Sequence, residues 1–351
     1  LAERLPAHVR DPRIGNLLLE KLQIRSEFAR LRQDPPRARV PRHHQASVVA
    51  NVPVRRRQLA TRVVHAATLG LQQHHGEHRV FDTSLSEEGI IGRAVGMAYA
   101  GLMPVPEIQY RKYADPATEH LNNCGTIRWR TNNRFAAPIV VRLAGGYRRI
   151  GDPWHSVTSE ATFAHQPGWL VAVPSNAADA VGLLRAALRG SDPVIFFEHR
   201  AMLDATWARR PYPGDDYVLP FGRASVVQSG DDLTVVTWGG MVERCEQAAA
   251  ELAASIEIID LRTLVPWDKS CVLQSIRKTG KCLIVHEEIL IAGFGAELAA
   301  TIAQESFTDL DAPIQRIGAP STPVPFSTEL MKGVIPQPTD IQQRMAELLA
   351  F

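Results

Sequence analysis

The chain has 351 residues, 45% of them hydrophobic and 22% charged, and its formal net charge at pH 7 is +2. This length and composition are ordinary for a globular protein of two or three domains with a large buried core. No apolar run approaches the roughly 18 residues that a membrane-spanning helix needs. The four cysteines form no CxxC pair, which argues against a disulfide scaffold or a structural zinc site and for a reducing compartment.

The first 63 residues differ from the rest of the chain in charge. They carry thirteen Arg and one Lys against five acidic residues, and residues 35–76 contain no Asp or Glu. Apolar spacing predicts helix within 1–34, whereas 35–63 has no sustained period and is predicted to be irregular. We therefore predict an atypical basic N-terminal extension over 1–63, either disordered or misread. Because Leu1 is not an initiator Met, we interpret the chain as a fragment or a processed product.

Strands and helices alternate over residues 64–203, which we predict to be the first α/β domain. An i, i+4 apolar row starts at Ile90 and marks a helix, and the segment from Ser84 to Glu87 fits a capping box at its start. Residues 204–219 are rich in Pro and charge and predict a linker. The alternation resumes over 220–345, so we predict a second domain, with both domains built as doubly wound parallel sheets covered by helices.

Capping residues mark the ends of two of these helices. Ser175 or Asn176 is expected to begin one helix, and Gly190 to end it. Gly280 is expected to end a helix of the second domain.

Three segments carry residues that are suited to chemistry. Glu87 stands at a helix start, where a carboxylate facing a cleft can hold a proton, although capping alone would explain it. His155 follows a glycine-rich basic loop after a strand, a position typical of an acid–base residue, although a lone His is more often structural. Tyr110 and Tyr113 end a strand and can pack in the core or against a flat heteroaromatic ring. The sequence holds no P-loop, HExxH or GxSxG motif, and we predict no metal site.

Five segments in a fixed order resemble the beta subunits of thiamine-diphosphate-dependent 2-oxo acid dehydrogenases. They read "RVFDTSLSEEGIIGRAVGMAYAGLMPVPEIQY", "HSVTSEATFAHQPGWLVAVPS", "DAVGLLRAALRGSDPVIFFEH", "IIDLRTLVPWD" and "LIVHEE…GFGAEL". The resemblance is strongest to the branched-chain and pyruvate decarboxylating components, and it extends from about Val64 to the C-terminus.

The resemblance implies a transketolase-like pyrimidine-binding domain over 64–203 and a transketolase C-terminal domain over 220–345. It implies that Glu87 hydrogen-bonds the aminopyrimidine ring of thiamine diphosphate and so promotes activation of the thiazolium carbon. Tyr113 would stack on the pyrimidine. His155 would orient the substrate and assist acyl transfer to a lipoyl group, while the cofactor acts as the electron sink.

The same resemblance implies that the active site needs a partner. In this family the alpha subunit binds the diphosphate and its magnesium, which fits the absence of a phosphate motif here. The implied partners are that alpha subunit, a lipoyl-bearing acyltransferase core and a 2-oxo acid, in a heterotetramer of two alpha and two beta chains. Neither nucleic acid nor a membrane is expected. The expected compartment is the cytoplasm, with the mitochondrial matrix as the alternative, because five acidic residues within 1–34 are atypical of a transit peptide.

The N-terminal extension is the main departure from the family. Relatives carry a strand ending in Gly-Glu-Asp and a Gly-Gly loop before the segment that matches "VHAATLGLQQHHG", and residues 35–63 resemble neither. Our hypothesis is that this tract is a frameshifted or wrongly joined reading. If the sequence is instead genuine, we expect the first domain to lack this strand.

Several functional alternatives stay open at this point. The leading hypothesis is oxidative decarboxylation of 3-methyl-2-oxobutanoate, and the alternatives within the family are a pyruvate or an acetoin dehydrogenase beta subunit. A deoxyxylulose-phosphate-synthase-like enzyme would need its own diphosphate site. A degenerate subunit would keep the fold and bind its partner without catalysis, and a basic tract that binds nucleic acid would do so in a salt-dependent manner. Substrate choice depends on a pocket shared with the alpha chain, where one methylene contributes about 1–3 kcal/mol.

Overall fold

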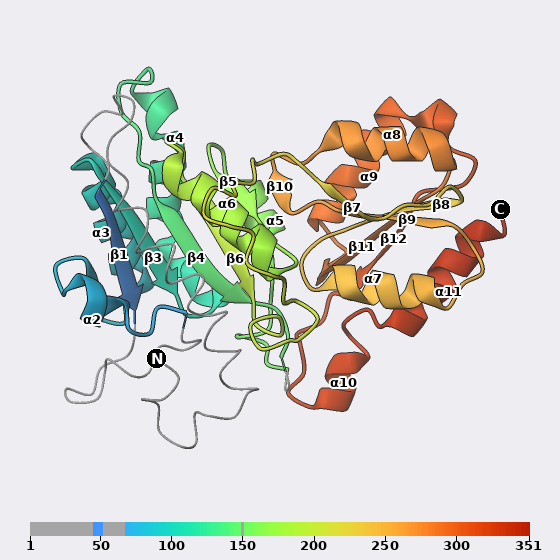
Figure 1. Ribbon diagram of the computed structural model, residues 1–351, viewed down its shortest axis with the longest axis horizontal. Coiled ribbons are helices and arrows are strands. Elements are labelled where there is room, and N and C mark those ends of the chain that lie inside the picture. Colours follow the sequence, from blue (N-terminus) through green and yellow to red (C-terminus); the bar gives the residue numbers. More distant parts are fainter. Residues whose placement is uncertain (1–44, 52–66, 149–150) are drawn as a thin grey trace.

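The computed structural model describes residues 67–148 and 151–351, together with the backbone of 45–51 (Figure 1). Figure 1 shows two lobes side by side, each a sheet with helices against its faces. In chain order the first lobe contains β1 (Gln45–Asn51), α2 (Leu71–His75), β2 (Val80–Thr83), α3 (Glu87–Tyr99), β3 (Leu102–Ile108), η4 (Arg111–Ala117), α4 (Thr118–Arg130), β4 (Val140–Gly145), α5 (Ala161–Ala164), β5 (Leu170–Ala172), α6 (Ala177–Arg189) and β6 (Val194–His199).

The second lobe follows after a segment, residues 200–224, that contains neither helix nor strand. Its elements are β7 (Ser225–Gln228), β8 (Leu233–Thr237), α7 (Met241–Ala250), β9 (Ile256–Asp260), β10 (Thr263–Val265), α8 (Lys269–Thr279), β11 (Cys282–Ile289), α9 (Phe294–Glu305), η5 (Phe307–Asp309), β12 (Gln315–Ala319), α10 (Thr328–Lys332) and α11 (Pro338–Leu349).

Both sheets are largely parallel. The first has the order β10-β5-β6-β4-β3-β1-β2 and the second the order β12-β11-β8-β9-β7. Among the described strands, only β10 on β5 and β7 on β9 pair antiparallel. Every residue of the central strands β4 and β8 is buried, as expected for parallel strands covered by helices on both faces. The predicted α/β class with two helix-covered sheets is confirmed, with one antiparallel edge strand in each sheet.

Strand β1 corrects one expectation from the sequence. It lies between β2 and β3 and runs parallel to both, with Val48 opposite Val80 on one side and Val105 on the other. The prediction of an irregular tract over 35–63 is therefore wrong for these seven residues, and the first sheet has a strand there. Backbone pairing on both sides stabilises a strand that periodicity alone does not reveal. The helix predicted within 1–34 lies outside the described residues, and a misread origin of the tract stays a hypothesis.

The helix ends confirm three of the predicted capping positions and contradict the predicted capping box. The Asn176 side chain caps α6, whose backbone leaves the helix at Gly190, and Gly280 ends α8 in a left-handed conformation with φ of 68°. The capping box from Ser84 to Glu87 is wrong. Helix α3 begins at Glu87, and its N-cap is Ser86. Ser84 cannot be the cap residue because it lies two residues earlier, in the loop after β2.

The sheets and the sequence halves do not coincide. Strand β10 comes from the second half of the chain yet completes the first sheet, where Thr263 pairs with Ala172 of β5. The connecting segment is held against α6, because the Arg185 guanidinium donates hydrogen bonds to the carbonyls of Gly214 (2.6 Å) and Tyr217 (2.8 Å). The domain limits 64–203 and 220–345, with a linker over 204–219, stay predictions.

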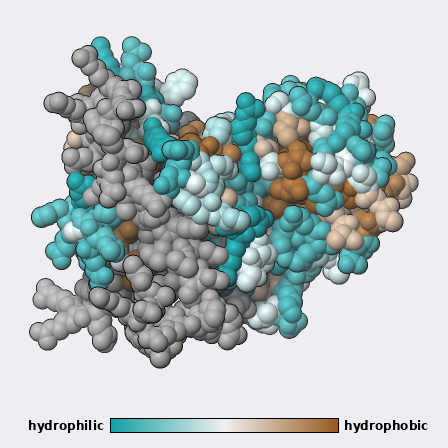
Figure 2. Space-filling view, in the orientation of Figure 1, coloured by the Kyte–Doolittle hydropathy of each residue, from teal (hydrophilic) through white to brown (hydrophobic). Residues whose placement is uncertain are grey.

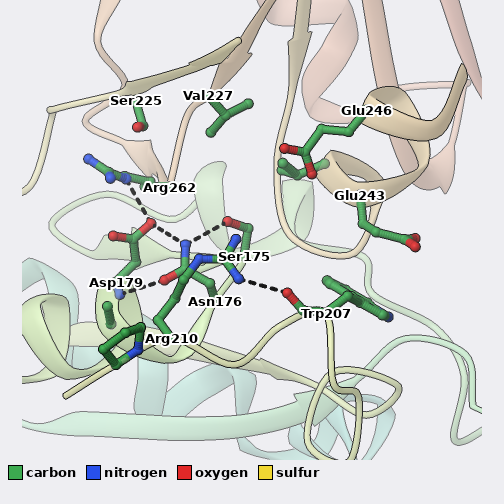
Figure 3. A pocket seen from close by; sticks show the side chains of 13 residues that line it. Ser175, Asn176, Asp179, Trp207, Arg210, Ser225, Val227, Glu243, Glu246 and Arg262 are labelled. Atoms are coloured by element: carbon green, nitrogen blue, oxygen red, sulfur yellow. Dashed lines mark hydrogen bonds and ion pairs between the residues drawn. The ribbon is translucent and has the colours of Figure 1, made fainter. Parts of the chain in front are cut away.

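Polar side chains from both lobes meet along the seam between them. Figure 3 shows Arg262 of the second lobe paired with Asp179 of α6, at 2.9 Å. Next to this ion pair, the Ser175 hydroxyl donates to the Asp260 carboxylate (2.5 Å), and the residues around it line a pocket of about 430 Å³. These bonds fix the two sheets relative to one another, in addition to the apolar core that they share.

Candidate active site

The predicted site residues all follow strands of the first sheet. Glu87 follows β2, Tyr113 follows β3, and His155 follows β4. Strands β1 to β4 run parallel through their shared pairings, so their carboxyl ends lie along one edge of the sheet. This edge is where open α/β sheets bind ligands, and the topology therefore supports a site there.

Three aromatic rings form the best-defined part of this edge. The Tyr113 hydroxyl lies 2.9 Å from Nε2 of His155. Tyr110 stacks on the same imidazole, with ring centroids 3.9 Å apart and planes inclined by 26°. Tyr113 meets both neighbours at steep interplanar angles, 78° to Tyr110 and 70° to His155, so neither of them stacks on its ring face. The structure thus brings the predicted residues Tyr113 and His155 into direct contact.

Asp152 shapes the turn that carries His155. Its Oδ1 accepts hydrogen bonds from the backbone amides of Trp154 (2.6 Å) and His155 (2.9 Å). Its Oδ2 lies 3.3 Å from Nδ1 of the imidazole. The two ring nitrogens of His155 therefore face different groups, a carboxylate at Nδ1 and a phenol at Nε2.

Arg200, directly after β6, holds the same turn from the neighbouring strand. Its Nη1 donates to the carbonyl oxygen of His155 at 2.8 Å, and its guanidinium lies 5.3 Å from the ring centroid of Tyr110. Burial lowers the pKa of Arg200, and it stays far above neutral pH because guanidinium groups do. Arg200 thus contacts both the backbone of His155 and the ring that stacks on it.

Glu87 is the first residue of α3, where the partial positive charge of the helix N-terminus favours a carboxylate. Its side chain is half-buried, and among the described residues its carboxylate forms no hydrogen bond or ion pair. Helix α3 packs against η4, the helix that carries Tyr113. Within the part of the chain that the structure describes, Glu87 forms no hydrogen bond or ion pair with Tyr113 or His155, whereas these two residues lie at hydrogen-bond distance from each other.

A buried arginine ties together the strands that carry the site. Arg142 of β4 has 1% of its side chain exposed and binds Glu198 of β6 through two bonds, 2.6 and 2.8 Å long. A third bond, 2.9 Å long, reaches Glu107 of β3. Burial raises the pKa of Glu107 more than Arg142 lowers it, whereas the two carboxylates raise the pKa of Arg142. This ion triad fixes the spacing of β3, β4 and β6, whose ends carry Tyr110, the His155 turn and Arg200.

Carboxyl groups with raised pKa lie at the seam behind the site. Glu160 is buried and accepts a hydrogen bond from the Trp238 indole at 2.6 Å, and burial raises its pKa. Glu288 accepts from the Ala161 amide at 3.2 Å, and burial together with the charge of Glu160 raises its pKa to about 9. Burial raises the pKa of Asp260 to about 7. Burial thus favours the protonated form of these three carboxyl groups, and their hydrogen bonds join one lobe to the other.

Sequence reasoning identified the aromatic residues and His155 but missed the groups that hold them. Asp152 stands three residues before His155 in "GDPWH", and this Asx-type spacing was a usable signal. Arg200 follows a buried strand directly, but nothing local indicates its bond to a residue 45 positions earlier.

The described residues, 67–148 and 151–351, contain neither a candidate metal cluster nor a candidate membrane span. No group of three or more His, Cys, Asp or Glu residues in this part of the chain is arranged to hold a metal ion. Nor does any helix within the same residues have the length and apolar character to cross a membrane.

Comparison with known families identifies both lobes. Residues 59–205 match the transketolase pyrimidine-binding domain, and residues 222–341 match the transketolase C-terminal domain. Among solved structures, the chain is similar to a split-gene transketolase described as an inactive beta4 tetramer. The TM-score is 0.71 at 19% identity, covering 94% of this chain and 98% of that one, which supports the fold. The chain is thus a two-domain protein of the transketolase-like class.

Curated relatives narrow the class to one family. The chain is 40% identical over 293 residues to the 2-oxoisovalerate dehydrogenase subunit beta of Bacillus subtilis, covering 82% of this chain and 89% of the relative. It is 40% identical over 281 residues to the subunit of the same name from Pseudomonas aeruginosa, covering 76% and 80%. Over 271 residues it is 40% identical to 2-oxoisovalerate dehydrogenase subunit beta 2, mitochondrial, of Arabidopsis thaliana, covering 76% and 75%. This chain belongs to the family of 2-oxoisovalerate dehydrogenase beta subunits.

Proposed function

We propose that this chain is the beta subunit of the decarboxylating component of a 2-oxo acid dehydrogenase, with 3-methyl-2-oxobutanoate as its substrate. The reaction is oxidative decarboxylation with acyl transfer to a lipoyl group. The names of the relatives support this substrate, and the Tyr113–His155 contact at the carboxyl edge of the first sheet is the structural observation that carries the proposal. Pyruvate is the second candidate, because the sequence segments also resemble pyruvate dehydrogenase subunits.

The residues at this edge suit the aminopyrimidine end of thiamine diphosphate. Glu87 offers a half-buried carboxylate without a partner among the described residues, and such a group can exchange a proton with a ring nitrogen. Tyr113 offers an aromatic ring on which neither neighbouring ring stacks. When bound, the cofactor supplies the electron sink for the loss of carbon dioxide. The site residues present therefore fit this group, and the proposal assigns its diphosphate and magnesium to the alpha subunit.

His155 has the acid–base role in this proposal. Its Nε2 faces the Tyr113 hydroxyl at 2.9 Å, so this nitrogen is the one that can exchange a proton with a group on the open side of the sheet edge. Once Nε2 carries a proton, it can also donate a hydrogen bond to the carboxylate of a 2-oxo acid. We assign Glu87 and His155 as catalytic residues, and Glu87 and Tyr113 as cofactor-binding residues.

Exposed apolar side chains support assembly with other subunits. Figure 2 shows a mostly hydrophilic surface that hydrophobic patches interrupt on the second lobe. Large apolar patches on a protein surface mark interaction sites. We propose that the chain assembles with an alpha subunit as two alpha and two beta chains, and that this assembly serves a lipoyl-bearing acyltransferase core. The exposed large apolar residues of the second lobe include Ile291, Phe307, Phe326 and Leu330.

The test is co-expression of the full chain with the alpha subunit encoded beside it. The purified complex is assayed with 3-methyl-2-oxobutanoate and with pyruvate, using an artificial electron acceptor, with and without thiamine diphosphate and magnesium. We expect cofactor-dependent turnover that favours the branched substrate. Equal or better turnover of pyruvate would replace the substrate assignment, and a stable complex without turnover would indicate a degenerate subunit.

A further inference from the structure

His155 has a different polar group at each ring nitrogen, and this asymmetry decides which nitrogen carries the proton. A neutral imidazole has one N–H donor and one lone-pair acceptor. An ionised carboxylate can only accept, whereas a phenol can donate. Asp152 Oδ2 lies 3.3 Å from Nδ1, and the Tyr113 hydroxyl lies 2.9 Å from Nε2. The pair of neighbours therefore favours the tautomer with the proton on Nδ1 and the lone pair on Nε2.

We propose that Asp152 is a positioning residue that fixes this tautomer of His155 and keeps Nε2 available as the proton-accepting atom. The inference rests on the proposed function of His155, since Asp152 acts through the imidazole and does not itself touch the substrate. When Nε2 takes a proton, the imidazolium that forms faces the Asp152 carboxylate, which stabilises its charge.

The surroundings of the imidazole hold it in place for this role. Tyr110 stacks on one face of the ring at 3.9 Å, and Arg200 holds the His155 carbonyl at 2.8 Å. Asp152 is in turn fixed by the two backbone amides that donate to its Oδ1, at 2.6 and 2.9 Å. Its two oxygens thus have separate tasks, since Oδ1 shapes the turn while Oδ2 faces the ring.

This division of tasks gives a direct test with two variants. Asp152→Asn keeps an oxygen for the two backbone amides but places an NH₂ group opposite Nδ1. Because this NH₂ group can only donate a hydrogen bond, Nδ1 must accept it, and the ring proton moves to Nε2. Asp152→Ala removes both the bonds to the backbone amides and the contact with Nδ1. If Asp152 only stabilises the turn, the Asn variant has the activity of the wild type and the Ala variant has a lower activity. If Asp152 fixes the tautomer, the Asn variant is impaired at least as strongly as the Ala variant.

Two readouts apply to the full chain in complex with its alpha subunit. The first is turnover, for which we expect kcat of Asp152→Asn to fall about a hundredfold, with KM within about twofold of the wild type. The second needs no turnover. An unprotonated imidazole nitrogen attacks a carbonyl carbon of diethyl pyrocarbonate and displaces ethyl carbonate, so the ring becomes acylated. Mass spectrometry after cleavage at Glu160 separates His155 from His165. We expect acylation of His155 at Nε2 to slow at least about fivefold in the Asn variant, while the exposed His165 reacts unchanged.

Each outcome decides between the possibilities. An Asn variant with kcat within twofold of the wild type and unchanged acylation of His155 would overturn the proposal and leave Asp152 as a turn residue. If the wild-type complex shows no turnover, the proposed function fails, and the acylation rates still decide the tautomer. Thermal unfolding of both variants controls for loss of the fold, and slower His155 acylation in a folded Asn variant supports the proposal.

Discussion

The ion triad of Arg142 is the perturbation with the largest expected effect on both stability and the site. Arg142→Met keeps much of the side-chain volume but leaves Glu107 and Glu198 in the sheet without their cation. The triad contains three charge-assisted hydrogen bonds of 2.6, 2.8 and 2.9 Å. Removing one partner of a buried ion pair costs about 3–5 kcal/mol, because the other charge stays buried and unpaired. We expect the variant to lose about this much free energy of unfolding at pH 8.

The loss depends on pH with a defined sign. Burial already raises the pKa of Glu107, and without Arg142 nothing opposes that effect. A carboxyl group with a raised pKa in the folded state binds a proton that the unfolded state releases, so its stabilising contribution is present at low pH and disappears as pH rises. Each proton bound in this way changes stability by about 1.4 kcal/mol per pH unit. The deficit of Arg142→Met should therefore be at least about 1 kcal/mol smaller at pH 5.5 than at pH 8.

Urea unfolding of the full chain at both pH values measures this. Glu107→Gln is the matched control, because it keeps the two bonds between Arg142 and Glu198 and removes one charge, and it should lose less than about 1.5 kcal/mol. The reasoning would be refuted if Arg142→Met lost less than about 1 kcal/mol, or if its deficit were the same at both pH values.

Three further predictions concern the cap, the seam and the thiols. Asn176→Ala removes the α6 cap and should cost about 1 kcal/mol in urea unfolding, so an unchanged midpoint would contradict the capping role. Because Glu288 has its pKa raised to about 9, its stabilising contribution should diminish as pH rises from 5 to 8, and Glu288→Gln should flatten that slope by up to about 1.4 kcal/mol per pH unit. If Glu288→Gln left the dependence of the unfolding free energy on pH unchanged, the proton bound by the folded state would not be on Glu288. Iodoacetamide at pH 8 should label the half-buried Cys271 first, as mass spectrometry can show, and early labelling of any other thiol would contradict the burial described. The thiols expected to react after unfolding, each with a pKa raised by burial to about 12, are Cys124, Cys245 and Cys282.

Local signals in the sequence predicted the features that depend on neighbouring residues. The helix that starts at Asn176 and the stop at Gly280 follow from capping chemistry within one turn. The alternation of strands and helices predicted two α/β domains, because parallel strands need crossover helices between them. Tyr113 and His155 were predicted as site residues from their places after strands, together with the resemblance to a family, and the structure places them in contact.

Features that depend on distant pairing were missed. Strand β1 has no periodicity of its own and exists through parallel bonds to β2 and β3. The three-residue strand β10 joins the first sheet across the seam, which its sequence does not reveal. Arg142 binds Glu107 and Glu198, which are 35 and 56 residues away in the sequence. Arg200 binds the backbone of His155, which is 45 residues away. Such contacts follow from strand order, which the sequence alone did not predict.

The central claim is that the edge of the first sheet is a thiamine-dependent active site in which Glu87 exchanges a proton with the cofactor. Its most direct test compares Glu87→Gln with Glu88→Gln in the complex with the alpha subunit. The two glutamates are adjacent on α3, but Glu88 lies on the exposed surface near His120. We predict that Glu87→Gln lowers the turnover of 3-methyl-2-oxobutanoate about a hundredfold or more, whereas Glu88→Gln stays within about twofold of the wild type. Equal turnover in the two variants would contradict the assignment of this site.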